Sequence, residues 1–250
     1  MTIDMPNNRA IAGLRRLWQE AFGDNDAFLD KFFSTGFSPR RCRCVTFDGR
    51  MAAALYWFDC SLGQHKLAYI YAVATDKAFR GRGLCRTLME DTHKHLKALG
   101  YAGAALVPGS PSLFSLYEKL GYTRFCPMEV LTVTPAADGA SVTECSAQAF
   151  LRLRREALPE GAVLQEGATA AFLSAFTRFY TSGTSLMCVT QEDDTLYFQE
   201  YLGSREALPG IVAALQAHKA LVRVPGGNPY AMYLDFGSCL HPAYFGIPLD

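Results

Sequence analysis

The spacing of hydrophobic residues predicts two helices near the start of the chain. Apolar side chains stand at positions 11, 14, 17, 18, 21 and 22, which is the spacing of one helix face, and Gly23 follows as a stop signal. Asp24 or Asn25 is a suitable N-cap for a second helix that runs through Phe33.

Runs of aromatic, β-branched and small apolar residues then predict a sheet. These runs cover residues 42–47, 51–58, 66–74, 101–107 and 122–133. Asp48-Gly49 joins the first two runs as a hairpin, and the third is almost wholly apolar, so we expect it in the centre of the sheet. Pro127 cannot donate a hydrogen bond to a neighbouring strand, which places the last run at an edge or a bulge.

Two further helices are predicted between these strands. Leucines spaced along residues 84–99 form a helical stripe that Gly100 ends, and residues 112–120 form a short helix. His93 and His95 cannot face each other at a spacing of two residues. We therefore expect them on or beside the solvated face of their helix rather than on a metal ion.

A linker is predicted at residues 135–141 (PAADGAS), which are small and include Pro and Gly. It separates a domain of residues 1–134 from one of residues 142–250. In the second part the pattern predicts helices at 147–157, 168–180 and 205–218, and strands at 185–190, 195–201, 220–224 and 230–236. The order strand, strand, helix, strand, strand repeats the order around residues 51–107, which favours a smaller, degenerate second copy of the first fold.

The composition is that of a globular protein without a strong charge. Of 250 residues, 50% are hydrophobic and 19% are charged, and 24 Lys and Arg balance 24 Asp and Glu. A general affinity for nucleic acid or for a membrane surface is therefore not indicated. The eight cysteines lack zinc-ligand spacing, and we find neither a signal peptide nor an apolar run of ~20 residues. We expect reduced thiols, no bound metal and a cytoplasmic location.

One stretch, V-A-T-D-K-A-F-R-G-R-G-L-C at residues 73–85, carries candidate chemistry. A dinucleotide-binding turn needs a third glycine where Arg86 stands, and the Lys-Ser/Thr pair of a Walker A loop is absent. What is left is a helix N-terminus with free N–H groups, two flexible glycines and flanking arginines, which suits an anion such as a diphosphate. On this loop alone, a basic turn without a ligand is the alternative.

Residues 70–125 resemble the acetyl-CoA-binding core of the GCN5-related N-acetyltransferases (GNATs). Arg80, Gly83 and Cys85 fall on that family's Arg/Gln-x-x-Gly-x-Gly/Ala signature, and L-F-S-L-Y-E-K-L-G-Y at residues 113–122 resembles its second signature. The two signatures occur in the family's order and on the expected elements, which makes the pair more specific than either one. The half after the linker resembles, more loosely, the truncated second domain of some bacterial members.

The resemblance implies an α/β acyl-CoA N-acyltransferase fold, with a mixed, mostly antiparallel central sheet flanked by helices. Acetyl-CoA would be the acyl donor, with its pantetheine arm on the splayed strand before the loop and its pyrophosphate on the loop. The residues implied for binding it are Val73, Ala74, Thr75, Arg80, Gly81, Arg82, Gly83, Leu84, Cys85, Arg86, Ser110, Phe114 and Tyr117. Tyr117 would also be the general acid that protonates the departing CoA thiolate, although its helix position suits a core aromatic as well.

Three features depart from the family pattern. Cys85 replaces a Gly or Ala, and its place at a helix N-terminus near arginines favours a lowered thiol pKa, yet we interpret it as a packing residue. Ser110 stands where many members carry an asparagine and keeps one hydrogen-bond donor. The run 66–74 holds no carboxylate to act as general base. Water, Asp59, a residue of the second half, or the chain end at Asp250, which related two-domain enzymes place in the site, would have to serve.

Two functions from different classes follow from this resemblance. The leading hypothesis is an enzyme, monomeric or homodimeric, that moves acetyl from acetyl-CoA to a primary amine of a small molecule or peptide by direct attack. The competing hypothesis is a CoA-binding sensor or scaffold without turnover, which the missing strand carboxylate favours and Tyr117 disfavours. The residues do not identify the acceptor amine or the length of the acyl chain.

Overall fold

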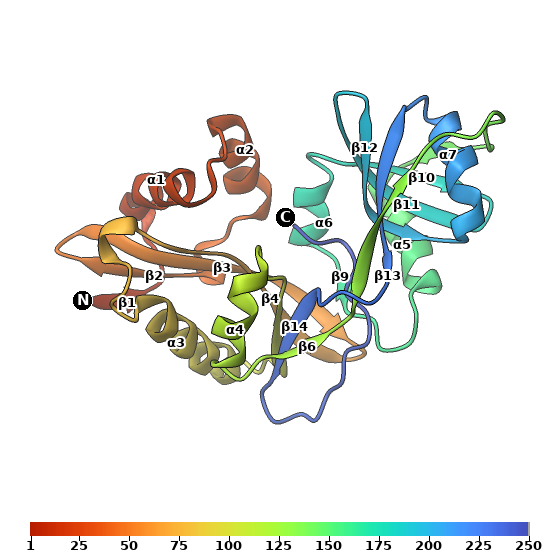
Figure 1. The fold of residues 1–250 in the computed structure, drawn as a ribbon. Coiled ribbons are helices and arrows are strands. Elements are labelled where there is room, and N and C mark those ends of the chain that lie inside the picture. Colours follow the sequence, from red (N-terminus) through yellow and green to blue (C-terminus); the bar gives the residue numbers. More distant parts are fainter. Residues whose placement is uncertain (250) are drawn as a thin grey trace.

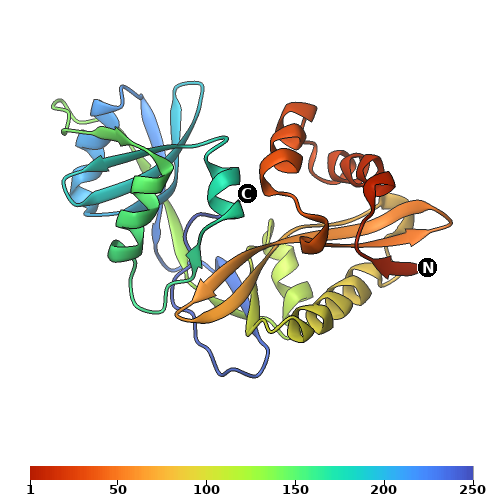
Figure 2. The same cartoon turned by 180° about the vertical axis from the view of Figure 1, so that it is seen from behind.

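The computed structural model describes residues 1–249, which fold around two β-sheets that lie side by side (Figure 1). The N-terminal half, coloured red to yellow, forms most of one sheet, and the C-terminal half, cyan to blue, forms most of the other. The last described residues run back between the two sheets, as the opposite view also shows (Figure 2).

The first sheet has eight strands in the order β1-β2-β3-β4-β5-β14-β6, with β9 paired to β3. The strands are β1 (Thr2–Asp4), β2 (Cys42–Phe47), β3 (Arg50–Leu62), β4 (His65–Thr75), β5 (Gly103–Leu106), β6 (Thr123–Phe125), β9 (Leu164–Gln165) and β14 (Ala231–Asp235). Among the described strands of this sheet, β4 and β5 alone run parallel. The sheet is thus mixed and mostly antiparallel, which confirms the predicted fold class.

Helices cover both faces of the first sheet (Figure 1). α1 (Ile11–Phe22) and α2 (Asp26–Lys31) lie on one face, and α3 (Leu84–Ala98) and α4 (Pro111–Glu118) lie on the other. Their ends follow the sequence signals, since Gly23 takes a φ of +81° after α1 and the Asn25 side chain accepts a hydrogen bond from the Phe28 N–H at the start of α2. Short 3-10 and π turns lie at η1 (Asn8–Ala10), η2 (Phe32–Gly36), η3 (Pro39–Arg41), η4 (Lys77–Phe79) and η5 (Arg205–Ala207).

The second sheet has six strands in the order β7-β13-β12-β11-β10-β8. They are β7 (Met128–Val133), β8 (Thr143–Cys145), β10 (Arg178–Ser182), β11 (Ser185–Glu192), β12 (Thr195–Leu202) and β13 (Lys219–Pro225). α7 (Leu208–Ala214) packs on one face and α5 (Ala147–Ala157) on the other, while α6 (Ala168–Leu173) reaches toward the first sheet. No helix within residues 1–249 is both long and apolar enough to cross a membrane.

The two halves of the chain exchange strands: besides the short β9, which pairs with β3, one longer strand crosses in each direction. β6 and β7 are neighbours in sequence, yet β6 ends the first sheet and β7 begins the second, with a break at Cys126, whose φ is +52°, and Pro127. β14 crosses in the opposite direction: it comes from the second half of the chain and lies in the first sheet, between β5 and β6. In each sheet the exchanged strand lies antiparallel to the strand that follows a crossover helix. Neither sheet is complete without a strand from the other half.

The element order repeats between the sheets. β2, β3 and β4 form an antiparallel meander, α3 follows, and β5 returns parallel to β4. In the second sheet β10, β11 and β12 form the meander, α7 follows, and β13 returns parallel to β12. The division predicted at residues 135–141 falls between β7 and β8, so β7 precedes it in the chain but belongs to the second sheet.

Two expectations about single elements are wrong. Residues 122–133 form two short strands in different sheets rather than one strand. Residues 168–180 are not one helix, because α6 ends at Leu173 and β10 follows. The hydroxyls of Ser174 and Thr177 bond to carbonyls of the last helical turn, which offers the backbone a way to leave the helix.

Candidate active site

The central feature of the first sheet is a point where two neighbouring strands part. β4 and β5 pair only as far as Tyr69 and Ala105. β4 then continues to Thr75 after β5 has ended, and among residues 1–249 no other strand pairs with it on that side. A register shift against β3 and a φ of +48° at Ala72 bend β4 here. The backbone of residues 70–75 is thus open on one side, and we call this opening the β4–β5 splay.

The glycine turn follows β4 and opens α3. Gly81 and Gly83 have φ angles of +75° and +74°, in the left-handed region that favours glycine, and a Cβ on either would meet no atom within 4 Å. Gly83 is the N-cap of α3, and no side chain caps this end. The first-turn N–H groups, the positive end of the helix dipole and the exposed Arg80, Arg82 and Arg86 therefore surround an accessible backbone. This arrangement suits a diphosphate.

A buried carboxylate holds the base of this turn. Asp76 is 3% exposed, accepts a hydrogen bond of 2.8 Å from the Ala78 N–H and one of 2.9 Å from Arg50. Burial raises the pKa of Asp76, but these bonds and the nearby arginines outweigh it, so the net pKa lies below its ordinary value. Arg80 is oriented in turn, because its Nε donates to the Thr75 carbonyl at 3.1 Å. The sequence signal for this anchor is an Asp at the start of a turn.

α4 lies on the same face of the sheet as α3 and brings the second signature to the splay. Phe114 and Tyr117 are buried on its inner side, at 8% and 7% exposure. Ser110 is the N-cap residue of α4, but its hydroxyl bonds to that of Ser112 at 3.0 Å instead of capping the helix. The residues predicted to bind the donor, which range from Val73 to Tyr117 in the sequence, thus belong to β4, the glycine turn, α3 and α4.

Tyr117 and Cys85 lie close enough to affect each other. Burial raises the pKa of the Tyr117 phenol well above its ordinary value, and the neighbouring Cys85 adds to the effect. Burial also raises the pKa of the Cys85 thiol, so the expectation of a lowered pKa is wrong: the helix N-terminus does not offset the loss of water. Tyr117 is therefore a protonated phenol, and Cys85 a neutral thiol, at neutral pH.

His93 contacts Tyr117 indirectly, through Tyr122, and this arrangement was not predicted from the sequence. It is buried, and its Nε2 shares a hydrogen bond of 2.8 Å with the Tyr122 hydroxyl. Burial, with a smaller contribution from Lys97, lowers the pKa of His93 to about 4. The Tyr122 ring packs edge-on against Tyr117 at 5.8 Å. The expectation of a solvated His93 is wrong, because the turn after α4 and residues after β14 cover this part of α3.

Aromatic rings line the opposite side of the splay. Tyr69 and Tyr71 of β4 pack on the α1–α2 face, where the Tyr71 ring lies 5.6 Å from Trp18 and 6.3 Å from Phe172. Phe172 belongs to α6 of the second half and also lies 5.8 Å from Phe28. The second half of the chain therefore closes this side of the first sheet.

The last described residues reach the same place. Residues 244–249, which we call the tail, are buried, and the Leu249 N–H donates to the Tyr69 hydroxyl at 3.1 Å. The Phe245 ring packs against Tyr69 at 4.8 Å. Asp250, one of the general bases considered from the sequence, lies outside the described residues. The tail thus ends beside the last β4 residue that pairs with β5.

Asp59, another of those bases, lies elsewhere. It stands opposite Ala68 in the paired part of β4, before the splay. Its carboxylate accepts a hydrogen bond from the Tyr101 hydroxyl and forms ion pairs with Lys66 at 3.5 Å and Arg41 at 3.7 Å. These partners account for Asp59 as part of a surface cluster.

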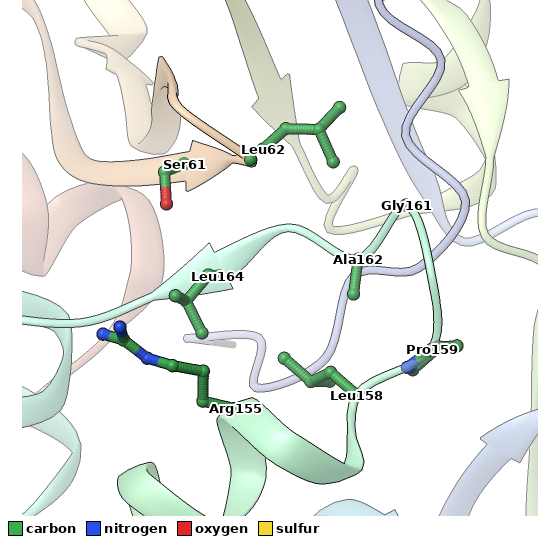
Figure 3. A pocket seen from close by; sticks show the side chains of 9 residues that line it. Ser61, Leu62, Arg155, Leu158, Pro159, Gly161, Ala162 and Leu164 are labelled. Carbon is green, nitrogen blue, oxygen red and sulfur yellow. The ribbon is translucent and has the colours of Figure 1, made fainter.

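Two crevices open on the surface away from the splay. The smaller, of about 200 Å³, lies between the tip of the β3–β4 hairpin and the segment that joins α5 to β9 (Figure 3). The larger, of about 440 Å³, lies along β6 and β14. Within the described chain we find no cluster of three or more metal-ligating side chains.

The first sheet thus combines a splayed parallel pair, a glycine-rich helix N-terminus and a buried tyrosine. Residues 3–125 match the family model described as an acetyltransferase (GNAT) domain. Residues 3–125 therefore form a GNAT domain. The match ends at β6, so β14, which completes the sheet, comes from outside the matched segment.

Solved structures share the fold along nearly the whole chain. A GCN5-related N-acetyltransferase from Anabaena variabilis superposes with a TM-score of 0.79 at 15% identity, over 95% of this chain and 73% of the other. One from Kribbella flavida gives a TM-score of 0.68 at 16% identity, over 93% and 70%. One from Sphaerobacter thermophilus gives 0.54 at 15% identity, over 98% and 97%. A comparison with curated protein sequences gave no match.

Proposed function

We propose that the protein transfers an acetyl group from acetyl-CoA to a primary amine of a small molecule or peptide. The observation that carries this proposal is the β4–β5 splay, which leaves residues 70–75 open next to an anion-binding helix N-terminus. An extended chain with amide groups adds readily to an open strand edge, and the pantetheine arm of CoA is such a chain. The GNAT fold supplies the same combination of strand edge and phosphate turn.

Each part of the donor is assigned to one group of residues. Val73, Ala74 and Thr75 bind the pantetheine arm through their backbone. Residues 80–86 bind the pyrophosphate through N–H groups and arginine side chains, and Phe114 packs along the arm with Ser110 as a hydrogen-bond donor. The open space around Gly81 and Gly83 supports this assignment, because a phosphate can approach the backbone there without displacing a side chain.

The reaction is a direct attack. The amine nitrogen forms a bond to the thioester carbon, the C–S bond breaks, and Tyr117 gives its proton to the departing CoA sulfur. The Tyr117 phenol is protonated at neutral pH and so carries the proton for this step, although burial, which raises its pKa, makes it a weaker acid than a free phenol. β4 offers no carboxylate, so a charged amine first loses a proton to water or to a base outside β4. After the C–N bond forms, the nitrogen releases a second proton to solvent, and solvent returns one proton to the Tyr117 phenolate. Positioning of the two reactants contributes most of the rate enhancement.

Thiol release from acetyl-CoA in the presence of a panel of primary amines tests this function. We expect amine-dependent release by the full chain and a rate about 10²-fold lower for Tyr117→Phe, which keeps the ring but removes the proton. Tight binding of acetyl-CoA without release for any amine would instead favour the sensor or scaffold.

Other parts of the proposal rest on the sequence pattern. We propose that the second half is a truncated copy of the first fold, and the repeated meander, helix and parallel strand support it. We assign the domains to residues 1–134, which contribute β7 to the second sheet, and 142–250, which contribute β9 and β14 to the first. The cytoplasmic location is supported by eight cysteines that are free thiols.

A further inference from the structure

A buried polar cluster lies in the second half of the chain, away from the donor site. Arg154 and Glu200 form a two-pronged ion pair with side chains that are 0% exposed, and the Arg154 Nη2 to Glu200 Oε1 distance is 2.9 Å. Arg154 Nη2 also donates to the Gln165 side-chain oxygen at 2.9 Å. Arg154 belongs to α5, Gln165 to β9 and Glu200 to β12, so the cluster joins three elements.

The tail completes this cluster. The Gln165 side-chain amide donates to the Gly246 carbonyl and, at 3.1 Å, to the Ile247 carbonyl. The Tyr244 hydroxyl donates to Glu200 at 3.2 Å. A Cβ on Gly246 would lie 1.7 Å from Glu200 Oε1, so only glycine fits there. The cluster therefore holds the tail through two backbone carbonyls and through the Tyr244 hydroxyl.

Further contacts fix the path of the tail between the two halves. The Val163 N–H donates to the Tyr244 carbonyl at 2.8 Å, and the neighbouring residues Ala162 and Leu164 line the crevice of Figure 3. The Phe245 N–H donates to Cys126 Sγ at 3.1 Å, and Cys126 lies where the chain crosses from one sheet to the other. From these anchors the tail runs to Tyr69 at the splay.

Stability alone explains this cluster poorly. A fully buried ion pair gains little over well-packed apolar side chains of the same volume, because desolvation offsets the attraction. Within residues 1–249, Arg154 Nη1 is buried without a hydrogen-bond partner, which costs folding free energy. The cluster does fix the position of the tail, because the Gln165 side-chain amide donates to two successive tail carbonyls.

We propose that Arg154, Gln165 and Glu200 are positioning residues that act through the tail on Tyr69. They hold residues 246–249 so that the Leu249 N–H fixes the Tyr69 hydroxyl at the point where β4 leaves β5. The inference rests on the proposed acetyl transfer, because it assigns the tail to the acceptor side of that site. The second half thereby sets the geometry of a reaction whose donor site lies in the first half.

Gln165→Leu is the first test, since it removes both bonds to the tail and keeps the side-chain size. We expect kcat to fall about 10- to 100-fold, as for a small misplacement at a reacting centre. The KM for acetyl-CoA should change by less than about twofold, because no donor contact is touched. Gln191→Leu is the matched control, since Gln191 bonds only within its own turn at the surface. A kcat equal to that of the control would overturn the proposal.

Double mutants of Gln165 and the tail distinguish a positioning role of Gln165 from a general role in holding the fold together. A chain that ends at Ile247 loses the Leu249 contact, and Tyr69→Phe removes its acceptor. If Gln165 acts through the tail, the loss in kcat for Gln165→Leu is not additive with that of either variant. Additive losses would show that Gln165 supports the fold in another way and would refute the proposal.

Hydrogen exchange gives a readout that does not require activity. In the wild-type chain and in Gln191→Leu, the Leu249 amide should be protected by its bond to Tyr69. In Gln165→Leu it should exchange faster by at least about 10-fold, while the amides of the central strands stay protected. Equal exchange would overturn the proposal. If the wild-type protein is inactive but shows the expected exchange, the proposed acetyl transfer is refuted, while the contacts between Gln165 and the tail are supported.

Discussion

A substitution at Gly83, the glycine at the start of α3, separates effects on stability from effects on donor binding. Gly83 has a φ of +74°, and a Cβ there would meet no protein atom within 4 Å. In Gly83→Ala, the free energy of unfolding therefore falls only by the cost of placing alanine in the left-handed region, about 1–2 kcal/mol. For a chain of this length that corresponds to a Tm decrease of roughly 2–8 °C.

The other end of the same helix offers a matched control. Gly100 has a φ of +78° and an equally open Cβ position. It lies at the C-terminus of α3, roughly 22–26 Å away at 1.5 Å per residue. Gly100→Ala should lower Tm by a similar amount, because the backbone strain is the same.

Only the variant at the N-terminus should affect the donor. The methyl group of Gly83→Ala occupies space in which the pyrophosphate would contact the backbone, so we expect the KM for acetyl-CoA to rise about 10-fold or more, equivalent to about 1.4 kcal/mol. Gly100→Ala should leave it unchanged. Melting curves and initial rates of thiol release measure both quantities. Equal KM values for the two variants would refute the placement of the pyrophosphate on this turn.

Three further predictions concern other parts of the molecule. Tyr117→Phe should lower kcat without raising the KM for acetyl-CoA. Because the pKa of Tyr117 is raised, the wild-type enzyme should keep its kcat between pH 7 and the ordinary tyrosine pKa of about 10. A decrease of kcat in this pH range that is absent in Tyr117→Phe would contradict this. Asp76→Asn should lower Tm by a few degrees at pH 7. Its folded pKa is depressed, so the stability it supplies is present above the unfolded pKa of about 3.9 and is lost as the pH falls from there through the folded pKa; a Tm difference that does not shrink as the pH falls below about 3.9 would contradict this. A fragment of residues 1–134 lacks β14 and should give no cooperative melting transition, whereas co-expression with residues 135–250 should restore one; a stable isolated fragment would show that the strand exchange is dispensable.

The sequence predicted the elements whose causes are local. Residues 42–47 and 147–157 were predicted with the bounds that β2 and α5 have, because strand and helix periodicity is strong there. The stop at Gly23 and the cap at Asn25 depend on neighbouring residues only. The glycine turn belongs to the same class, since positive φ angles and an uncapped helix start can be read from a short motif.

Features that depend on distant contacts were not predictable in this way. The strand from 230 to 236 was expected, but its pairing partners β5 and β6 lie more than a hundred residues earlier in the chain. His93 has the spacing of a solvated residue and is buried only because Tyr122 and Phe236 pack over it. The polar cluster around Arg154 leaves no local signal, since its three members come from three separate elements.

The site divides along the same line. The proposed donor side consists of two contiguous motifs, residues 73–86 and 110–117, and both are recognisable in the sequence. The side that we assign to the acceptor is assembled from α1, β4, α6 and the tail, so its aromatic lining forms only after the two halves have packed together. This explains why the residues indicate the donor and leave the acceptor open.

Acetyl transfer itself is the most direct test of the account. Mass spectrometry of a reaction with acetyl-CoA and an amine that supports thiol release should detect one N-acetylated amine for each free CoA formed. The product should be nearly absent with Tyr117→Phe and unchanged with Gln191→Leu. Free CoA without an acetylated amine, or equal product from the Tyr117→Phe variant, would contradict a direct transfer at the β4–β5 splay.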